Sequence, residues 1–411
     1  MKTIVILGGG VGGIVAANEL RKRLDIRHKI ILIEKNRIHA FAPSFLWLMT
    51  GSRKKEEITK DISQLLNNGI EIINEEVLSI KTDENIVETS GRKISFDYLV
   101  AAMGADIYPA SLPGLPKEAH NYYSIDGAER LYADLQKFEK GKVAVVIESL
   151  PYKCPAAPYE GAMLISDYFT KKGSRDDIEI SIYTPEPFPM PVGGPGLGEA
   201  VKQVLAAKNI TLFPLHKIYE VDSAKKELFF DNNRNYGYDM LIVIPAHKVS
   251  GVIMHSNLAG ENGWIPVDRS TLQTKYTNIY AIGDNTSVSI PGKWKPDVPL
   301  MLPKAGIFAH IQAEVVAKRI AGEINGKVST EEFCGDGFCM LEAGEHSAGF
   351  AYGNFFGSPS PDVKIRNVGK TWHWGKILFE KWWLSSFGFK KSLLKLMMKI
   401  GMIFMRIPIK I

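Results

Sequence analysis

Short apolar runs alternate with helical stretches along most of the chain, and this pattern predicts an α/β fold. Continuous apolar runs are typical of parallel strands that helices cover on both faces. The chain of 411 residues is long enough for two or three packed domains. The expected strands are Thr3–Leu7, Lys29–Ile33, Tyr98–Gly104, Val143–Ile147, Ile178–Tyr183, Met240–Ile244 and Asn278–Asp284, and the expected helices are Ile14–Arg23, Gly161–Tyr168 and Ile307–Ile320.

A glycine motif follows the first strand and predicts a dinucleotide-binding turn. Gly8, Gly10 and Gly13 lie in GGGVGG, and Glu34 follows the next strand. Glycine permits a tight turn and a close approach of the backbone, the helix N-terminus faces a pyrophosphate, and the acid accepts a hydrogen bond from a ribose hydroxyl. An acid here disfavours a 2′-phosphate, so we expect FAD or NAD rather than NADP.

Two later strand ends favour FAD. The sequence YLVAAMG ends at Gly104, and NIYAIGD ends at Gly283 and Asp284. The second resembles the motif with which two-domain flavoprotein reductases hold the ribityl and phosphate part of FAD. The first resembles the strand that leads from their FAD-binding domain to a second domain. The three motifs, in this order, predict bound FAD.

The second strand–turn–helix unit, Lys142–Tyr168, has a different turn. Three prolines, Pro151, Pro155 and Pro158, surround Cys154 where a dinucleotide-binding unit would have glycines. Proline has no N–H to offer a phosphate, so this turn is poorly suited to a dinucleotide. After the strand Ile178–Tyr183, where an NAD-binding domain would carry an acid, the chain has Thr184 and Pro185, and the later GGPGLG sequence is expected to form a turn.

These motifs predict a discontinuous domain organisation. Residues 1–104 and 239–325 are expected to form an FAD-binding domain, which the strand Met240–Ile244 re-enters. Residues 105–238 are expected to form a second Rossmann-like domain that has lost its NAD site. Residues 326–411 are expected to hold a strand pair with Cys339, within Cys334–Phe350, and an amphipathic tail.

The tail from Lys376 onward is strongly basic, with eight lysines and arginines against one acid, whereas the whole chain has a net charge of only +5. Lys391, Lys395 and Lys399 recur every four residues, with Trp382, Trp383 and Phe387 nearby. A basic amphipathic helix with aromatic residues predicts contact with a membrane surface; a dimer or core contact is the alternative. The start, MKTIVILGGG, is interpreted as a strand rather than a signal peptide, which predicts a peripheral membrane protein on the cytoplasmic face. No nucleic-acid partner is expected, and a homo-oligomer stays open.

Taken together, these motifs resemble the sulfide:quinone oxidoreductase family and its relative flavocytochrome c sulfide dehydrogenase. The resemblance covers nearly the whole chain, and its most specific part is CPAAPYE, Cys154–Glu160, paired with the late Cys339. PKAG at residues 303–306 and HAFAPSFLWL, His39–Leu48, also match. The family implies two Rossmann-like domains of the glutathione-reductase type, plus a C-terminal amphipathic membrane-binding region.

The resemblance also implies a mechanism. Cys154 and Cys339 would form a redox-active pair beside noncovalent FAD, hydrosulfide would attack the oxidised pair, and quinone would take the electrons. Glu160 would manage thiol protons, or it would be a solvated carboxylate at a helix start. Lys304 would lie near flavin and quinone, or it would be a surface lysine. The family's other cofactor contacts fall on Lys35 and Pro43, and His247 is a weaker candidate for proton relay.

Two departures from the family matter. Many members carry a third cysteine ahead of the CPxAP turn, whereas this chain has none before Cys154. We therefore expect a two-cysteine mechanism and no cysteine tether to FAD. Cys334, five residues before Cys339, is expected to be a bystander rather than a resolving thiol.

Three other functions were weighed against this one. A type II NADH:quinone dehydrogenase would share the fold and tail but needs NADH in the second domain. A flavocytochrome subunit would need a secretion signal and a haem partner. A noncatalytic flavin or persulfide sensor would reduce its flavin with sulfide but fail to pass electrons to a quinone.

Overall fold

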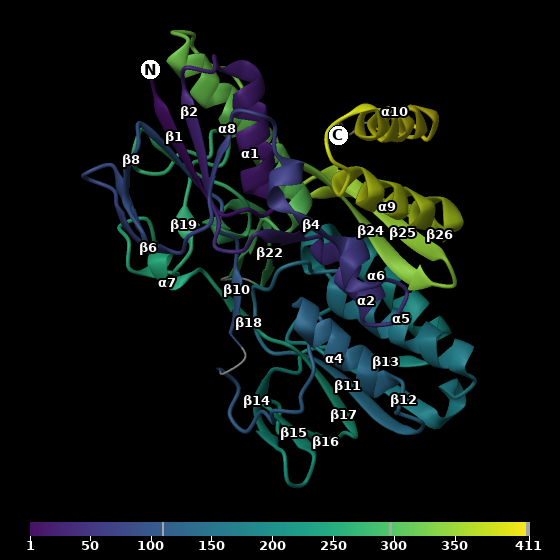
Figure 1. The fold of residues 1–411 in the computed structure, drawn as a ribbon. Helices are drawn as coiled ribbons and strands as arrows, with labels where there is room; N and C mark the ends of the chain where they lie inside the picture. Colours follow the sequence, from purple (N-terminus) through teal and green to yellow (C-terminus); the bar gives the residue numbers. More distant parts are fainter. Residues whose placement is uncertain (109–110, 296–297, 408–411) are drawn as a thin grey trace.

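The computed structural model describes residues 1–108, 111–295 and 298–407. Two parallel sheets lie one above the other, and a smaller C-terminal sheet with two helices flanks them (Figure 1). The parallel sheets confirm the predicted α/β fold. Residues 408–411, the end of the predicted tail, lie outside the described residues.

The first sheet is built from the apolar runs that flank the glycine motif. Helices α1 (Val11–Arg23) and α8 (Gly306–Ile324) pack side by side on one face, and the three-stranded sheet β6–β8 covers the other. The strand order is β20 (Ile279–Ala281), β9 (Tyr98–Ala101), β1 (Thr3–Leu7), β2 (Lys29–Ile33) and β5 (Glu71–Ile73), all parallel.

The second sheet has the same plan with different covers. Its order is β13 (Ile210–Phe213), β12 (Ile178–Tyr183), β11 (Gly141–Ile147) and β17 (Met240–Ile244), again parallel. The helices α4 (Ile125–Leu135), α5 (Ala157–Lys172) and α6 (Gly194–Ala207) share the core on one face. On the other face lies the sheet of β14 (Ile218–Asp222), β15 (Glu227–Phe230) and β16 (Asn235–Gly237).

The expected return to the first domain at residue 239 is wrong by one strand. Met240–Ile244 pairs with β11 in the second sheet, because a fully apolar five-residue strand suits the centre of either sheet. The chain crosses between the domains through β10 (Asp106–Tyr108) and β18 (Ala246–Lys248), which pair with each other. The GGPGLG sequence also differs from the expected turn, since α6 begins at Gly194 with Pro195 in its first turn, where proline is tolerated.

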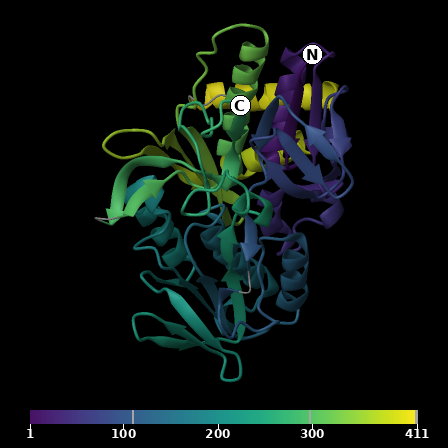
Figure 2. The same ribbon diagram turned by 90° about the vertical axis from the view of Figure 1, so that its left-hand side faces the viewer.

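The C-terminal region contains the predicted strand pair and a third strand. The antiparallel strands β24 (Asp336–Gly344), β25 (Ser347–Asn354) and β26 (Asp362–Gly369) lead into α9 (Lys370–Trp383) and α10 (Phe389–Phe404). The β24 strand packs on α5 of the second domain, so the region bridges both parallel sheets (Figure 2).

Trp382 and Trp383 were expected beside a membrane surface, but both are buried against the first domain. Lys391 and Lys395 of α10 also turn toward the protein, where their ammonium groups lie 5.8 Å from the Trp382 ring centroid. The exposed face of α10 is instead apolar. It consists of Phe389, Leu393, Leu396, Met397, Ile400, Ile403 and Phe404.

The remaining short elements connect these layers. They are β3 (Ile38–Ala40) with β4 (Thr59–Asp61), α2 (Phe45–Leu48), α3 (Lys55–Ile58), β6 (Val77–Lys81), β7 (Ile86–Thr89), β8 (Lys93–Ser95), α7 (Gly251–Met254), β19 (Ile265–Pro266) with β21 (Thr286–Ser287), and β22 (Ser289–Lys295) with β23 (Val298–Met301). Among the described residues, no helix combines the length and the apolar character needed to cross a bilayer.

Candidate active site

The glycine turn after β1 has the geometry of a phosphate cradle. A Cβ at Gly13 would lie 1.9 Å from the carbonyl oxygen of Gly8, and Gly8 itself has φ +98°. A Cβ at Gly10 would meet no heavy atom within 4 Å, and no side chain caps the N-terminus of α1. The first N–H groups of α1 therefore face open space, which fits a pyrophosphate.

Glu34 is held beside this turn by two backbone donors. The N–H of Gly9 donates to Oε2 at 2.7 Å, and that of Asn36 donates to Oε1 at 2.8 Å. Lys35 is exposed and pairs with Glu76, and Pro43 is exposed in a short 3₁₀ turn. The structure brings Glu34 to the cradle but gives Lys35 and Pro43 no buried contact with it.

Asp284 supplies a second anchor suited to FAD. Its Oδ1 is buried and has no hydrogen-bond partner among the described residues, and burial raises the pKa of the carboxyl while Lys304 and Lys153 oppose the rise. A buried acceptor without a donor is costly, and a ribityl hydroxyl would satisfy it. Gly104 has φ +70° and open space at its Cβ position. These residues and the glycine cradle fit FAD.

Lys304 is buried, so its interpretation as a surface lysine is wrong. Its ammonium donates to the carbonyl oxygens of Asp284 (2.7 Å) and Thr286 (3.2 Å) and lies 3.3 Å from the Trp264 ring centroid. Burial lowers the pKa of Lys304 to about 8, although Asp284 opposes this. Lys304 therefore borders the same anchor as Asp284.

The proline–cysteine turn lies directly against this segment. The N–H of Cys154 donates to the carbonyl oxygen of Lys304 at 2.7 Å, and Lys153 forms a β-bridge with the same residue. Cys154 has φ +54°, a strained conformation for a residue with a side chain. The second domain thus presents its cysteine to the Asp284–Lys304 side of the cradle.

Cys154 and Cys339 share charged neighbours. Burial raises the pKa of the Cys154 thiol to about 12 and that of Cys339 further, and the charge of Glu160 raises both while that of Lys376 lowers both. The charge of Cys154 also raises the pKa of Cys339. All three cysteines are free thiols in this structure, and Cys334 is exposed on the surface. The redox pairing of Cys154 with Cys339 stays a prediction.

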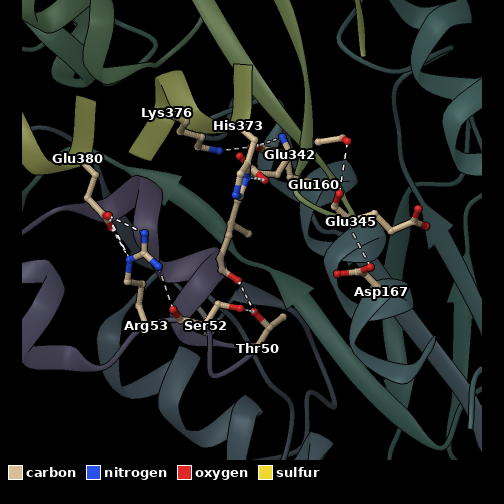
Figure 3. Close-up of polar contacts among 12 residues, drawn as sticks. Thr50, Ser52, Arg53, Glu160, Asp167, Glu342, Glu345, His373, Lys376 and Glu380 are labelled. Atoms are coloured by element: carbon tan, nitrogen blue, oxygen red, sulfur yellow. Dashed lines mark hydrogen bonds and ion pairs between the residues drawn. The ribbon is translucent and has the colours of Figure 1, made fainter. Parts of the chain in front are cut away.

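Glu160 is 2% exposed, so its interpretation as a solvated carboxylate is wrong. Its Oε1 accepts from Lys376 Nζ at 2.6 Å and from the backbone N–H of Glu342 at 2.8 Å (Figure 3). Burial alone would lower the pKa of Lys376, but Glu160 and Glu342 reverse this and raise it. A fixed cation on α9 therefore lies beside the cysteine pocket.

His247 is neutral in this environment. Burial and the charges of Lys153 and Lys304 lower its pKa to about 3, while a hydrogen bond between Nδ1 and the Pro245 carbonyl opposes this. Its Nε2 is buried without a partner among the described residues. Its role in proton relay stays a prediction.

The sequence analysis missed several residues of this region. Lys376 was counted only as part of a basic tail, and nothing in the pattern showed that it pairs with Glu160. Trp383 Nε1 donates to His39 Nε2 at 2.9 Å, while His39 Nδ1 contacts the Gly9 carbonyl at 3.1 Å. This chain of contacts ties α9 to the glycine turn.

Glu186 is an acid that the sequence analysis did not recognise in the second domain. It lies three residues after β12 and is buried. Its Oε2 accepts from Tyr159 (2.6 Å), Tyr152 (3.1 Å) and Thr184 (3.2 Å). Because three hydroxyls already occupy that oxygen, the acid is poorly placed to bind a ribose.

Comparisons with known proteins agree with this geometry. Residues 2–147 match the pyridine nucleotide-disulphide oxidoreductase family model. The chain is 31% identical over 401 residues to the sulfide-quinone reductase of Aquifex aeolicus, covering 93% of this chain and 90% of that protein. The chain belongs to the sulfide:quinone oxidoreductase family. It is therefore an oxidoreductase and a flavoprotein of a superfamily that typically binds FAD.

The structure agrees with this family assignment. The crystal structure of the Aquifex aeolicus sulfide:quinone oxidoreductase matches with a TM-score of 0.86 and 26% identity, covering 99% of this chain and 96% of that one. The mitochondrial sulfide:quinone oxidoreductase of Mus musculus is 29% identical over 300 residues, covering 69% of this chain and 66% of the mouse protein. The aligned part thus spans about two thirds of the mouse relative.

Proposed function

We propose that this protein oxidises sulfide to sulfane sulfur or polysulfide with Cys154, Cys339 and noncovalent FAD, and passes the electrons to quinone. The observation that carries the proposal is the common environment of the two thiols. Both feel the charges of Glu160 and Lys376, and Cys154 is hydrogen-bonded to the segment that borders the FAD anchor. Two sulfurs placed so are suited to exchange between thiol and disulfide.

The first step is attack on the oxidised cysteine pair. Hydrosulfide forms an S–S bond to one cysteine, the Cys154–Cys339 bond breaks, and the other cysteine leaves as a thiolate. The fixed ammonium of Lys376 stabilises that thiolate, since its charge lowers the pKa of both thiols. FAD, when bound, supplies the two-electron carrier between the cysteines and the quinone.

Aromatic residues between the FAD cradle and α9 suit a planar acceptor. Phe379 lies 6.0 Å from Phe41 and 6.4 Å from Phe338, measured between ring centroids. Phe338 directly precedes Cys339 on β24, and Phe41 belongs to the segment that follows β3. A quinone ring among these side chains would lie near the cysteine pocket without entering the polar cradle.

The apolar face of α10 supports attachment to a membrane surface. Seven large apolar side chains on this face are exposed, and such patches mark interaction sites. We propose that residues 326–411 form a membrane-binding unit, that residues 1–104 and 239–325, less β17, bind FAD, and that the protein is peripheral on the cytoplasmic face.

The test is an anaerobic titration of the purified protein with sulfide, followed by decylubiquinone, read at the flavin absorbance. We expect sulfide to bleach the flavin and the quinone to restore its colour. Bleaching by NADH instead would favour a type II NADH:quinone dehydrogenase, for which the occupied Glu186 is unfavourable. Bleaching by sulfide without reoxidation by quinone would identify a sensor.

A further inference from the structure

A cleft of about 1280 Å³ opens beside the cysteine pocket and has no part in the mechanism above. It lies between the α9–α10 connection, the β24–β25 turn and the segment from Trp47 to Lys60. Figure 3 shows its polar side chains, with Arg53 and Glu380 on one side and His373 and Glu342 toward Glu160. Water in this cleft can therefore approach the buried charges next to the thiols.

Glu342 and His373 form a buried pair in the cleft wall. His373 Nδ1 lies 2.8 Å from Oε2 of Glu342, and the carboxylate side is only 1% exposed. The other oxygen, Oε1, is buried and has no partner among the described residues. An unsatisfied buried carboxylate oxygen is costly, so a pair kept in this state is suited to take up and release a proton.

Three elements place other charged or titratable groups against this pair. Glu160 comes from α5, Lys376 from α9, and His346 from the β24–β25 turn, where its ring lies 5.3 Å from that of His373. The Trp47 ring of α2 contacts His373 edge-on at 6.0 Å. The backbone N–H of Glu342 bonds Glu160, and the charges of both carboxylates act on Lys376, so these groups form one network.

Sulfide oxidation, on which this inference rests, must release protons in a buried pocket. Each hydrosulfide oxidised to the sulfane level yields one proton and two electrons (HS⁻ → S⁰ + H⁺ + 2e⁻). The electrons leave to the quinone, which takes up two protons when it is reduced to the quinol. The proton left at the cysteines needs a path to water, and the buried Glu160–Lys376 pair cannot supply it alone.

We propose that Glu342 and His373 are the proton exit of the cysteine pocket. They receive protons released at the Glu160–Lys376 pair, and His373 delivers them to water in the cleft. The pair touches neither substrate nor cofactor, so its members are proton-transfer residues. Their loss should slow proton release while leaving FAD binding intact.

The test is stopped-flow measurement of sulfide-driven flavin bleaching between pH 6 and 9. His373→Phe, which keeps an aromatic contact with Trp47, and the near-isosteric Glu342→Gln should each slow bleaching about tenfold or more and change its pH profile. In His373→Gly, added imidazole should restore the rate, which a purely structural role would not allow. Lys381→Gln, on the cleft wall, is the matched control and should behave as wild type.

Wild-type rates and pH profiles in both variants, or a His373→Gly defect that imidazole does not relieve, would overturn the proton exit. If His373→Phe does not fold, as judged from FAD content and melting temperature, Glu342→Gln decides alone. Wild-type protein that sulfide does not bleach would instead overturn the proposed function, so the two failures are distinguishable.

Discussion

The two strand–turn–helix units of this protein share a topology but differ in their turns. After β1 the turn is built of glycine, and the N-terminus of α1 is open to a phosphate. After β11 the turn is built of proline, and it ends at Cys154, whose backbone is held to Lys304. The same fold element thus presents backbone N–H groups in one domain and a thiol in the other.

The difference shows how the two domains divide their tasks. A phosphate cradle requires N–H donors and room for the ligand, which glycine provides and proline does not. A redox thiol requires a fixed side-chain position, and prolines at the start of α5 with a strained φ at Cys154 supply it. The following predictions test this division, beginning with the largest effect.

Removal of the thiol from the second turn should abolish chemistry but not cofactor binding. We expect Cys154→Ser and Cys339→Ser each to slow sulfide-driven flavin bleaching by about a thousandfold or more, because neither sulfur can be bypassed. FAD should remain bound, since the cradle lies in the other turn. The measurement is anaerobic bleaching together with the FAD-to-protein ratio.

Cys334→Ser is the matched control, because Cys334 is exposed and should leave the rate nearly unchanged. Equal losses in all three variants would contradict the proposed pairing. Flavin that stays with acid-precipitated wild-type protein would contradict noncovalent binding.

The sequence was sufficient to predict both turns but not what surrounds them. Gly8, Gly13 and Cys154 act through their own backbone and side-chain chemistry, which local sequence reveals. Glu160 pairs with Lys376, 216 residues away, and such a contact depends on how α9 packs. For the same reason Trp383, which resembles a membrane anchor in isolation, is a buried donor to His39 in the fold.

Two alanine substitutions in the first turn should separate folding from cofactor binding. Gly13→Ala places a methyl group against the Gly8 carbonyl and should destabilise the protein itself by about 1–3 kcal/mol. Gly10→Ala meets no protein atom, so the apo-protein should unfold as wild type does. Its affinity for FAD should fall about tenfold or more, because the methyl group occupies the space that the phosphates need.

The measurements are the melting temperature of the apo-proteins and FAD affinity by fluorescence titration. Unchanged FAD affinity in Gly10→Ala would place the phosphates elsewhere and would remove the contrast between the two turns.

The acids that follow the second strand of each unit extend the comparison. Glu34 accepts from two backbone N–H groups and stays beside the open cradle. Glu186 accepts from three side-chain hydroxyls and is buried. A propensity pattern detects an acid near a strand end but not the direction of its side chain, which tertiary packing of Tyr152 and Tyr159 decides here.

Burial of Glu186 predicts a specific pH dependence of stability. Burial raises its pKa from 4.5 to about 7, although the three hydroxyls oppose the rise. The folded state then binds a proton that the unfolded state releases, so this contribution is complete below pH 4.5 and is lost as the pH rises through 7. The loss amounts to about 3 kcal/mol at most. Glu186→Gln should remove it, so the variant should gain a few degrees of melting temperature relative to wild type between pH 5 and 8. Glu179→Gln, on the exposed side of the same strand, should follow wild type throughout. Parallel curves for wild type and Glu186→Gln would show that Glu186 keeps its charge, and the second acid would then resemble the first.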